Sequence, residues 1–118
     1  MTEVKSNIKP EVAFEELMKL DIRICEIINV EKVEKSNKLY KLTINTGSDE
    51  RVVVSGLAKF YTEEQLKGRR IPFILNLAPR PIMGIESHGM IVAAQNNDET
   101  LSVLDADDNN SHAGAIVF

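Results

Sequence analysis

The sequence predicts an all-β chain with short helices, in which five strands close a small barrel. Three observations support this prediction: apolar and polar residues alternate over several short runs, turn-forming residues separate the runs, and only two short segments have helical features. With 118 residues, the chain fits one domain with one core. We expect a flexible N-terminal segment over residues 1–10, the barrel with a leading helix over residues 11–94, and a C-terminal extension over residues 95–118.

A short helix and a long strand are expected first. The helix covers Glu11 to Leu20, because Pro10 suits a helix start and the apolar residues after it approximate helical spacing. The strand covers Asp21 to Val33, where isoleucine and valine alternate with polar residues. Ile27 breaks this alternation, which predicts a bend or a bulge within the strand.

The next two strands form a predicted hairpin. Residues 35–38 are typical of a turn, and Leu39 to Asn45 then alternates cleanly, with Tyr40 on the apolar face. Residues 47–50 supply a turn into a third strand over Arg51 to Ser55.

A second short helix and two more strands complete the barrel. Thr62 to Leu66 begins with an N-cap residue and carries acids in its first turn. Ile71 to Leu77 is expected to be the fourth strand, a long ordered loop follows over Ala78 to His88, and Gly89 to Ala94 supplies the fifth strand. Three strands, a short helix and two strands is the element order of an OB fold, whose binding surface lies across strands two and three and the loops beside them.

The C-terminal extension has two expected parts. Leu101 to Leu104 is typical of a weak strand, and the chain ends with an apolar segment over Ala113 to Phe118. An apolar terminus must pack somewhere, so this segment either caps the barrel or meets another subunit.

Acidic residues are concentrated in the C-terminal extension. The net charge of −4 by itself argues against a nucleic-acid partner, because Lys and Arg side chains usually neutralise phosphates in such complexes. Residues 95–118, however, hold five acids and no Lys or Arg, which leaves 14 basic and 13 acidic side chains in residues 1–94. Such a body can present a basic face, although the same mixture also describes plain solvated surface.

Cysteine content and hydropathy indicate a cytoplasmic protein. Cys25 is the only cysteine, so no internal disulfide forms, and its isoleucine-rich strand favours an inert buried thiol. No apolar stretch approaches the ~20 residues that span a bilayer, and we expect no membrane role. His88 and His112 lack further ligands at metal-binding spacing, and no catalytic motif occurs, so we expect no enzyme activity, no metal and no cofactor.

Four segments resemble the tRNA-binding domain family: Lys19 to Ile24, Asn37 to Leu42, Val53 to Leu57 and Asn76 to Ala94. The last is the strongest match, because its Met-Gly-Ile-Glu-Ser-His-Gly-Met run, from Met83 to Met90, agrees with the family signature almost position for position. The family includes the C-terminal domain of bacterial methionyl-tRNA synthetases, free-standing structure-specific tRNA-binding proteins and the endothelial monocyte-activating polypeptide-like proteins.

The chain departs from the family pattern at two places. The family usually carries His-Pro and a small acidic cluster where this chain has Val33 to Asn37, so the contacts of that turn differ. A glycine common in the first strand is replaced by Cys25, which is still small.

The resemblance implies that the segment Asn76 to Met90 reaches the tRNA, with Ser87 and Met90 at positions tied to binding. A serine can donate a hydrogen bond to a phosphate or a base edge, and a methionine can lie against an unstacked base. Alternatively, the methionines fill the mouth of the barrel and the cations are plain surface. Phe60 and Tyr61 are candidate stacking rings, whereas Tyr40 fits the core better. The other predicted tRNA-binding residues lie at family-like positions around the presumed groove: Lys38, Arg51, Lys59, Asn76, Arg80 and Met83.

By this resemblance, the function is a non-catalytic module that recognises tRNA shape and assists an aminoacyl-tRNA synthetase, of the methionyl type, in cis or in trans. The expected partners are tRNA, a methionyl-tRNA synthetase and a second copy of the chain, because free-standing members form homodimers through their C-terminal part. Two alternatives exist on the same fold. One is a secretion-type peptide-binding chaperone, whose branch lacks the Met83 to Met90 motif, and the other is a protein-docking module that uses the acidic tail.

Overall fold

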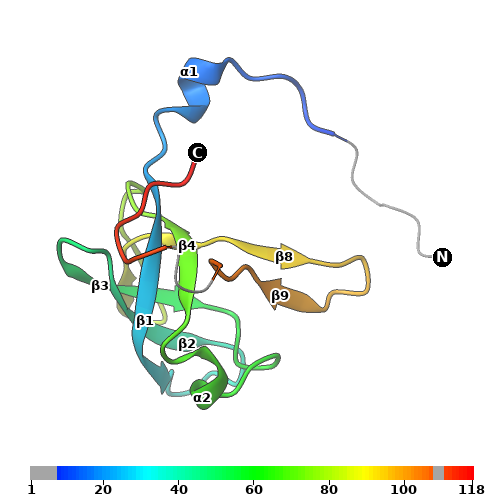
Figure 1. Ribbon diagram of the computed structural model, residues 1–118. Helices are drawn as coiled ribbons and strands as arrows, with labels where there is room; N and C mark the ends of the chain where they lie inside the picture. Colours follow the sequence, from blue (N-terminus) through cyan, green and yellow to red (C-terminus); the bar gives the residue numbers. More distant parts are fainter. Residues whose placement is uncertain (1–7, 108–110) are drawn as a thin grey trace.

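Five antiparallel strands wrap into a nearly closed barrel, as the sequence predicts (Figure 1). The computed structural model describes residues 8–107 and 111–118. The strand order in the sheet is β3-β2-β1-β4-β7. The two edges approach each other where the His88 N–H donates to the Val52 carbonyl oxygen over 2.9 Å. The bounds of these strands are β1 (Ile22–Lys32), β2 (Tyr40–Asn45), β3 (Glu50–Ser55), β4 (Arg70–Ile74) and β7 (Met90–Ile91).

The core fills the barrel with the inward residues of each strand. In β2, Tyr40, Leu42 and Ile44 are buried and the residues between them are half-buried, which confirms the predicted alternation. Tyr40 belongs to this core, and its hydroxyl donates to the Tyr61 carbonyl oxygen. The largest fully buried core side chains are Phe73, Ile27, Leu42, Ile44, Leu57, Leu66 and Ile71.

A bulge in β1 lets this long strand serve both halves of the barrel. Its first part pairs with β4 and its second part pairs with β2, and the β2 register shifts between Ile27 and Asn29. Ile27 is fully buried and Ile28 is half-buried, so the bulge turns Ile27 inward. The predicted bulge is confirmed, and it explains the break in the alternation at Ile27.

The leading helix is much shorter than predicted. Only α1 (Phe14–Leu17) forms, where Glu11 to Leu20 was expected. Ala13 occupies the N-cap and provides no side-chain cap, and every residue of α1 is exposed, so neither capping nor burial extends the turn. By contrast, α2 (Glu63–Leu66) has a capping box from Thr62 and buries Leu66 completely.

The predicted loop over residues 78–88 is instead a hairpin, formed by β5 (Arg80–Ile82) and β6 (Ile85–Ser87). The turn residues Met83 and Gly84 have φ of 51° and 79°, and positive φ at both central positions is the geometry that matches the twist of a two-residue hairpin. The expectation of a loop was wrong because Pro79 and Pro81 look like strand breakers, although proline is tolerated in an edge strand such as β5.

The fifth strand is also shorter than predicted, because β7 ends after two residues. Val92 donates to the Pro72 carbonyl oxygen, and Pro72 has no N–H to return a bond, so the ladder stops there. The chain then leaves the barrel as a separate hairpin of β8 (Ala93–Gln95) and β9 (Leu101–Val103) (Figure 1). The predicted weak strand at Leu101 to Leu104 is therefore confirmed, with the partner β8.

The C-terminal segment returns to the barrel and runs along the start of β1. Gly114 donates to the Ile24 carbonyl oxygen over 2.7 Å, Ile24 donates to Ala115 over 2.8 Å, and Val117 donates to Ile22 over 2.8 Å. The C-terminus lies at the same end of the molecule as α1 (Figure 1). The side chains of Ile116 and Phe118 remain exposed.

Candidate nucleic-acid interface

The β5–β6 hairpin lies across β3 and is attached to it by a buried serine. The Val54 N–H donates to Ser87 Oγ over 2.9 Å, and only 3% of Ser87 and 7% of Val54 are exposed. The predicted binding residue Ser87 is thus buried, and its Oγ accepts the hydrogen bond that ties the hairpin to the sheet.

An open hollow of about 320 Å³ lies between this hairpin and the sheet. Arg80 is the only charged residue on its lining, and Met90 at its edge is 48% exposed. No hydrogen bond or ion pair holds the Arg80 guanidinium within the described part of the chain. Met83, at the hairpin tip, is 54% exposed rather than packed in the barrel mouth. The remaining lining residues are Val54, Leu77, Ala78, Ile82, Ser87 and Gly89.

A second, more polar hollow of about 570 Å³ adjoins the first, because Leu77 and Ala78 line both. Arg51 lies on its wall but is engaged within the protein: its Nη1 donates to the Leu75 carbonyl oxygen over 2.7 Å, and its Nε lies 3.3 Å from Asp49. His88 Nε2 is 3.5 Å from the same guanidinium. The sequence did not single out this role of His88, because an isolated histidine carries no local signal.

Asn76, another predicted contact, fastens the N-terminal segment to the barrel. Its Oδ1 accepts from the Asp21 N–H over 2.7 Å, and its Nδ2 donates to the Lys19 carbonyl oxygen over 2.6 Å. Both functional atoms of the side-chain amide are thus occupied, although the residue is exposed.

Lys38 and Lys59 lie away from the hairpin. Lys38 belongs to the β1–β2 connection, where its carbonyl oxygen accepts from the Ala58 N–H over 3.0 Å. Lys59 lines a third hollow of about 370 Å³ beside α2, together with Lys32 and Phe60. The structure therefore brings Arg80, Ser87 and Met90 to one hollow, with Met83 in the hairpin turn beside it. Arg51 and Asn76 line the adjoining hollow, whereas Lys59 lines a separate one and Lys38 lies next to that third hollow through its carbonyl oxygen.

The charged groups around the polar hollow are mostly paired. The Thr46 hydroxyl and Arg51 hold the pKa of the Asp49 carboxyl below its usual range. A hydrogen bond and the charge of Asp21, which lies 2.7 Å from Arg23 Nε, raise the pKa of the Arg23 guanidinium. Burial raises the pKa of the Cys25 thiol to about 11, in agreement with the predicted buried cysteine. Of the arginines that line the two hollows, Arg23 and Arg51 are paired with Asp21 and Asp49, whereas Arg80 has no ion pair within the described ranges.

Residues 8–107 and 111–118 contain no group of three or more His, Cys, Asp or Glu side chains placed to hold a metal ion. Within the same ranges, no helix has the length and apolar content needed to cross a bilayer.

Sequence comparison relates the chain to a defined family. The family model described as "Putative tRNA binding domain" matches residues 22–115. A methionine–tRNA ligase of Bacteroides fragilis is 44% identical over 97 residues, which is 82% of this chain and 14% of that enzyme. The chain thus spans a small part of the length of the curated relatives that it matches.

Structural comparison agrees with the fold. A MetRS related protein from Pyrococcus horikoshii superposes with a TM-score of 0.88 at 28% identity, covering 93% of this chain and all of that one. The chaperone CsaA of Bacillus anthracis superposes with a TM-score of 0.82 at 20% identity, covering 92% of this chain and all of that one, a likeness that concerns the fold alone. Because a single family model covers residues 22–115, this chain belongs to the tRNA-binding domain family.

Proposed function

We propose that this chain is a non-catalytic module that binds folded tRNA through the face formed by the β5–β6 hairpin and β7. The observation that carries the proposal is the open hollow on this face, which is lined by the half-exposed Met90 and by Arg80, a residue without an ion pair in the described ranges; the exposed Met83 lies at the tip of the hairpin beside it. Membership of the tRNA-binding domain family supports the same face, because the match to the family model, over residues 22–115, includes the whole hairpin.

Each group on the hairpin face has a distinct role in this proposal. Arg80 binds a phosphate, since a guanidinium forms paired, charge-assisted bonds to phosphate oxygens. Met83 and Met90 contact an exposed base or ribose with polarisable, adaptable side chains. Met83 has a positive φ of 51°, an unfavourable conformation for a residue with a Cβ, and such strain is often retained where a side chain serves recognition.

Three of the predicted residues act on the position of this face. Ser87 holds the hairpin on β3 through Val54, and Arg51 supports the start of the loop through the Leu75 carbonyl oxygen. Asn76 fixes the same loop to the N-terminal segment. Recognition of RNA by shape requires such a rigid surface, because the partner is read by outline and charge rather than by one base.

We further propose that the module assists an aminoacyl-tRNA synthetase of the methionyl type in the cytoplasm. Methionine–tRNA ligases of Bacteroides fragilis and Cytophaga hutchinsonii are 44% and 48% identical to the chain, and the match covers 14% of each enzyme. A weak tRNA binder that is tethered or docked beside a synthetase raises the local tRNA concentration without touching the chemistry.

A homodimer is proposed for the end of the molecule where the C-terminal segment lies close to α1 (Figure 1). The backbone of residues 114–117 packs on β1, whereas Ile116 is 65% exposed and Phe118 is fully exposed. Phe14 and Leu17 of α1 are exposed at the same end. A second copy would cover these apolar side chains, and sizing the protein by light scattering tests this: a mass of one chain at high concentration contradicts it.

A titration with bulk tRNA over a salt series tests the proposed function. We expect the logarithm of the binding constant to fall steeply with the logarithm of salt concentration, and Arg80→Gln to lower the slope by roughly 0.7–0.9, the contribution of one phosphate contact. Lys19→Gln is the matched control, because it removes the same charge from a lysine already paired with Glu16. Absence of binding at low salt refutes the proposal and favours a peptide-binding or docking role on this fold.

A further inference from the structure

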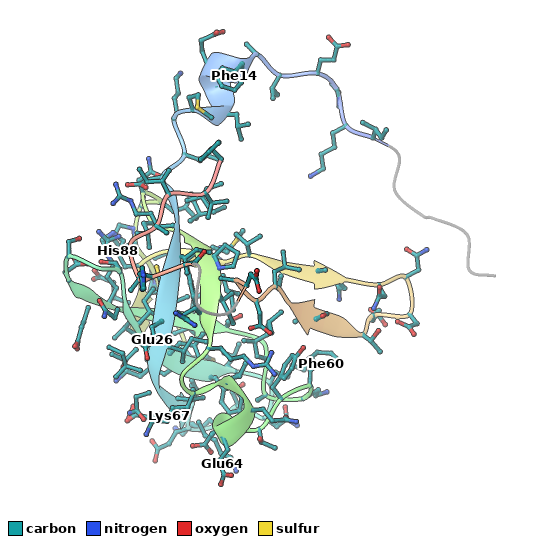
Figure 2. The ribbon with its side chains drawn as sticks, in the orientation of Figure 1. Phe14, Glu26, Phe60, Glu64, Lys67 and His88 are labelled. Atoms are coloured by element: carbon teal, nitrogen blue, oxygen red, sulfur yellow. The ribbon has the colours of Figure 1, made fainter. Side chains whose placement is uncertain are left out.

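We propose that the surface around Phe60 is a second RNA-binding site, at which an unpaired base stacks on the phenyl ring while Lys32 and Lys59 bind the neighbouring phosphates. The site is separate from the hollow beside the hairpin, because the two hollows share no lining residue. Figure 2 also shows Phe60 well separated from His88, which follows Ser87 in the sequence. The inference depends on the proposed function only in taking RNA as the ligand.

Phe60 is exposed on a rigid turn between β3 and α2. The N–H groups of Phe60 and Tyr61 both donate to the Leu57 carbonyl oxygen over 3.0 Å, and Leu57 is 1% exposed. The Tyr61 carbonyl oxygen accepts from the Tyr40 hydroxyl over 2.8 Å, which ties the other end of the turn to the core. The ring of Phe60 is 40% exposed, so an aromatic face is held toward solvent at little entropic cost of binding.

The surroundings of Phe60 distinguish it from an ordinary exposed apolar residue. Single exposed hydrophobic side chains are common on protein surfaces and by themselves indicate nothing. Phe60, however, lines a hollow of about 370 Å³ whose wall includes two lysines and the polar side chains of Thr62 and Gln65. The exposed Phe14 offers a contrast, because the residues that follow it in α1 are Glu15 and Glu16.

The lysines at this hollow have no acidic partner to displace. Within the described ranges, no ion pair holds Lys32 or Lys59, whereas Lys19 and Lys41 on other surfaces are paired with Glu16 and Glu31. The backbone of Lys38 also lies beside this hollow, since its carbonyl oxygen accepts from the N–H of Ala58, a lining residue. Glu63 is the one acid on the lining, so the cations outnumber it.

An aromatic ring flanked by unpaired lysines is the combination that binds unpaired nucleotides. The ring stacks on a base of any sequence, and the ammonium groups bind the backbone on either side. Paired RNA hides the faces of its bases, so this site selects a loop, a bulge or an end of the RNA. Two contacts on separate sides of one small barrel also raise the total affinity for a folded RNA that reaches both.

A tryptophan reporter tests the stacking directly, because the chain contains no tryptophan. In Phe60→Trp, titration with a short unstructured oligonucleotide and with tRNA should quench the indole fluorescence as a base stacks on it. Phe14→Trp places the same reporter on the N-terminal segment and corrects for absorption by the RNA. The inference is overturned if the oligonucleotide and tRNA quench the fluorescence of Phe60→Trp no more than that of Phe14→Trp.

Affinity provides the second readout. Phe60→Leu keeps an apolar side chain and removes the ring, and it should weaken binding of the oligonucleotide at least about fivefold, the lower end of the effect of one stacked base. An unchanged Tm shows that Phe60→Leu is folded, and unchanged affinity for the oligonucleotide overturns the inference. If Arg80→Gln leaves tRNA binding unchanged while RNA quenches the fluorescence of Phe60→Trp, RNA binding by the hairpin face is refuted and RNA binding at Phe60 is supported.

Discussion

Substitution of Ser87 by alanine separates a positioning role from a direct RNA contact. The Ser87 hydroxyl is buried, and its Oγ accepts the Val54 N–H over 2.9 Å. Alanine removes the acceptor and adds no other, so the Val54 N–H is left buried without a partner. Because this bond fastens the β5–β6 hairpin to β3, we expect both stability and RNA binding to fall in Ser87→Ala.

The magnitude follows from the cost of an unsatisfied buried donor. Such a group costs about 1–3 kcal/mol in the free energy of unfolding. For a domain of this size, a loss of 1 kcal/mol lowers Tm by about 4 °C or more. Ser102→Ala is the control, because Ser102 is exposed and its hydroxyl makes only a long 3.4 Å bond to the adjacent Val103 carbonyl oxygen.

The assay combines thermal unfolding with hydrogen exchange at single amides. We expect Ser87→Ala to lower Tm, to speed exchange of the Val54 amide, and to weaken tRNA binding, while Ser102→Ala changes none of the three. If Tm and the Val54 exchange rate stay unchanged while tRNA affinity falls, the hydroxyl contacts RNA directly and the positioning role is refuted.

Three further predictions concern the barrel and its attachments. Gly89→Ala should lower the free energy of unfolding, measured in urea, by at least ~2 kcal/mol, because a Cβ at φ 122° would lie 2.9 Å from the Ile74 carbonyl oxygen. Gly84→Ala is the control, with positive φ but open space around a Cβ, and it should cost about 1 kcal/mol. Equal costs in the two variants would contradict the clash at Gly89. Asn76→Ala should speed proteolysis within residues 11–20, since it removes both side-chain bonds that hold this segment, and an unchanged cleavage rate argues against that attachment. Burial raises the pKa of the Cys25 thiol from 9.0 to about 11, so the thiol of the unfolded chain ionises first and the free energy of unfolding should fall as pH rises between these values. In urea unfolding, Cys25→Ala should lack this part of the decrease, and the same decrease in both proteins contradicts the shift.

Local pattern was enough to predict the barrel because its strands carry the signal in their own residues. The alternation in β2, the bulge at Ile27 and the capping box at Thr62 all follow from chemistry within a few residues of each position. The lengths of α1 and β7 did not follow, because α1 lacks a cap and burial, and β7 ends where Pro72 on another strand offers no N–H.

The candidate site was predictable only in part. The family-like segment Asn76 to Ala94 contains Arg80, Met83 and Met90, and the structure puts Arg80 and Met90 on the lining of one hollow and Met83 at the tip of the hairpin beside it. The engagement of Arg51 by Leu75, the attachment made by Asn76 and the burial of Ser87 depend on contacts between segments far apart in the sequence. Residue type therefore indicated which side chains can bind RNA, and only the fold separated free groups from those already held within the protein.

Hydrogen exchange of the free and tRNA-bound chain shows whether the face of the β5–β6 hairpin and β7 binds the RNA. We expect slower exchange on binding for amides of β5, β6 and the turn between them, whose residues Met83 and Gly84 are exposed in the free protein. Binding by this face is contradicted if saturating tRNA leaves the exchange rates of all these amides unchanged and slows exchange only elsewhere on the barrel.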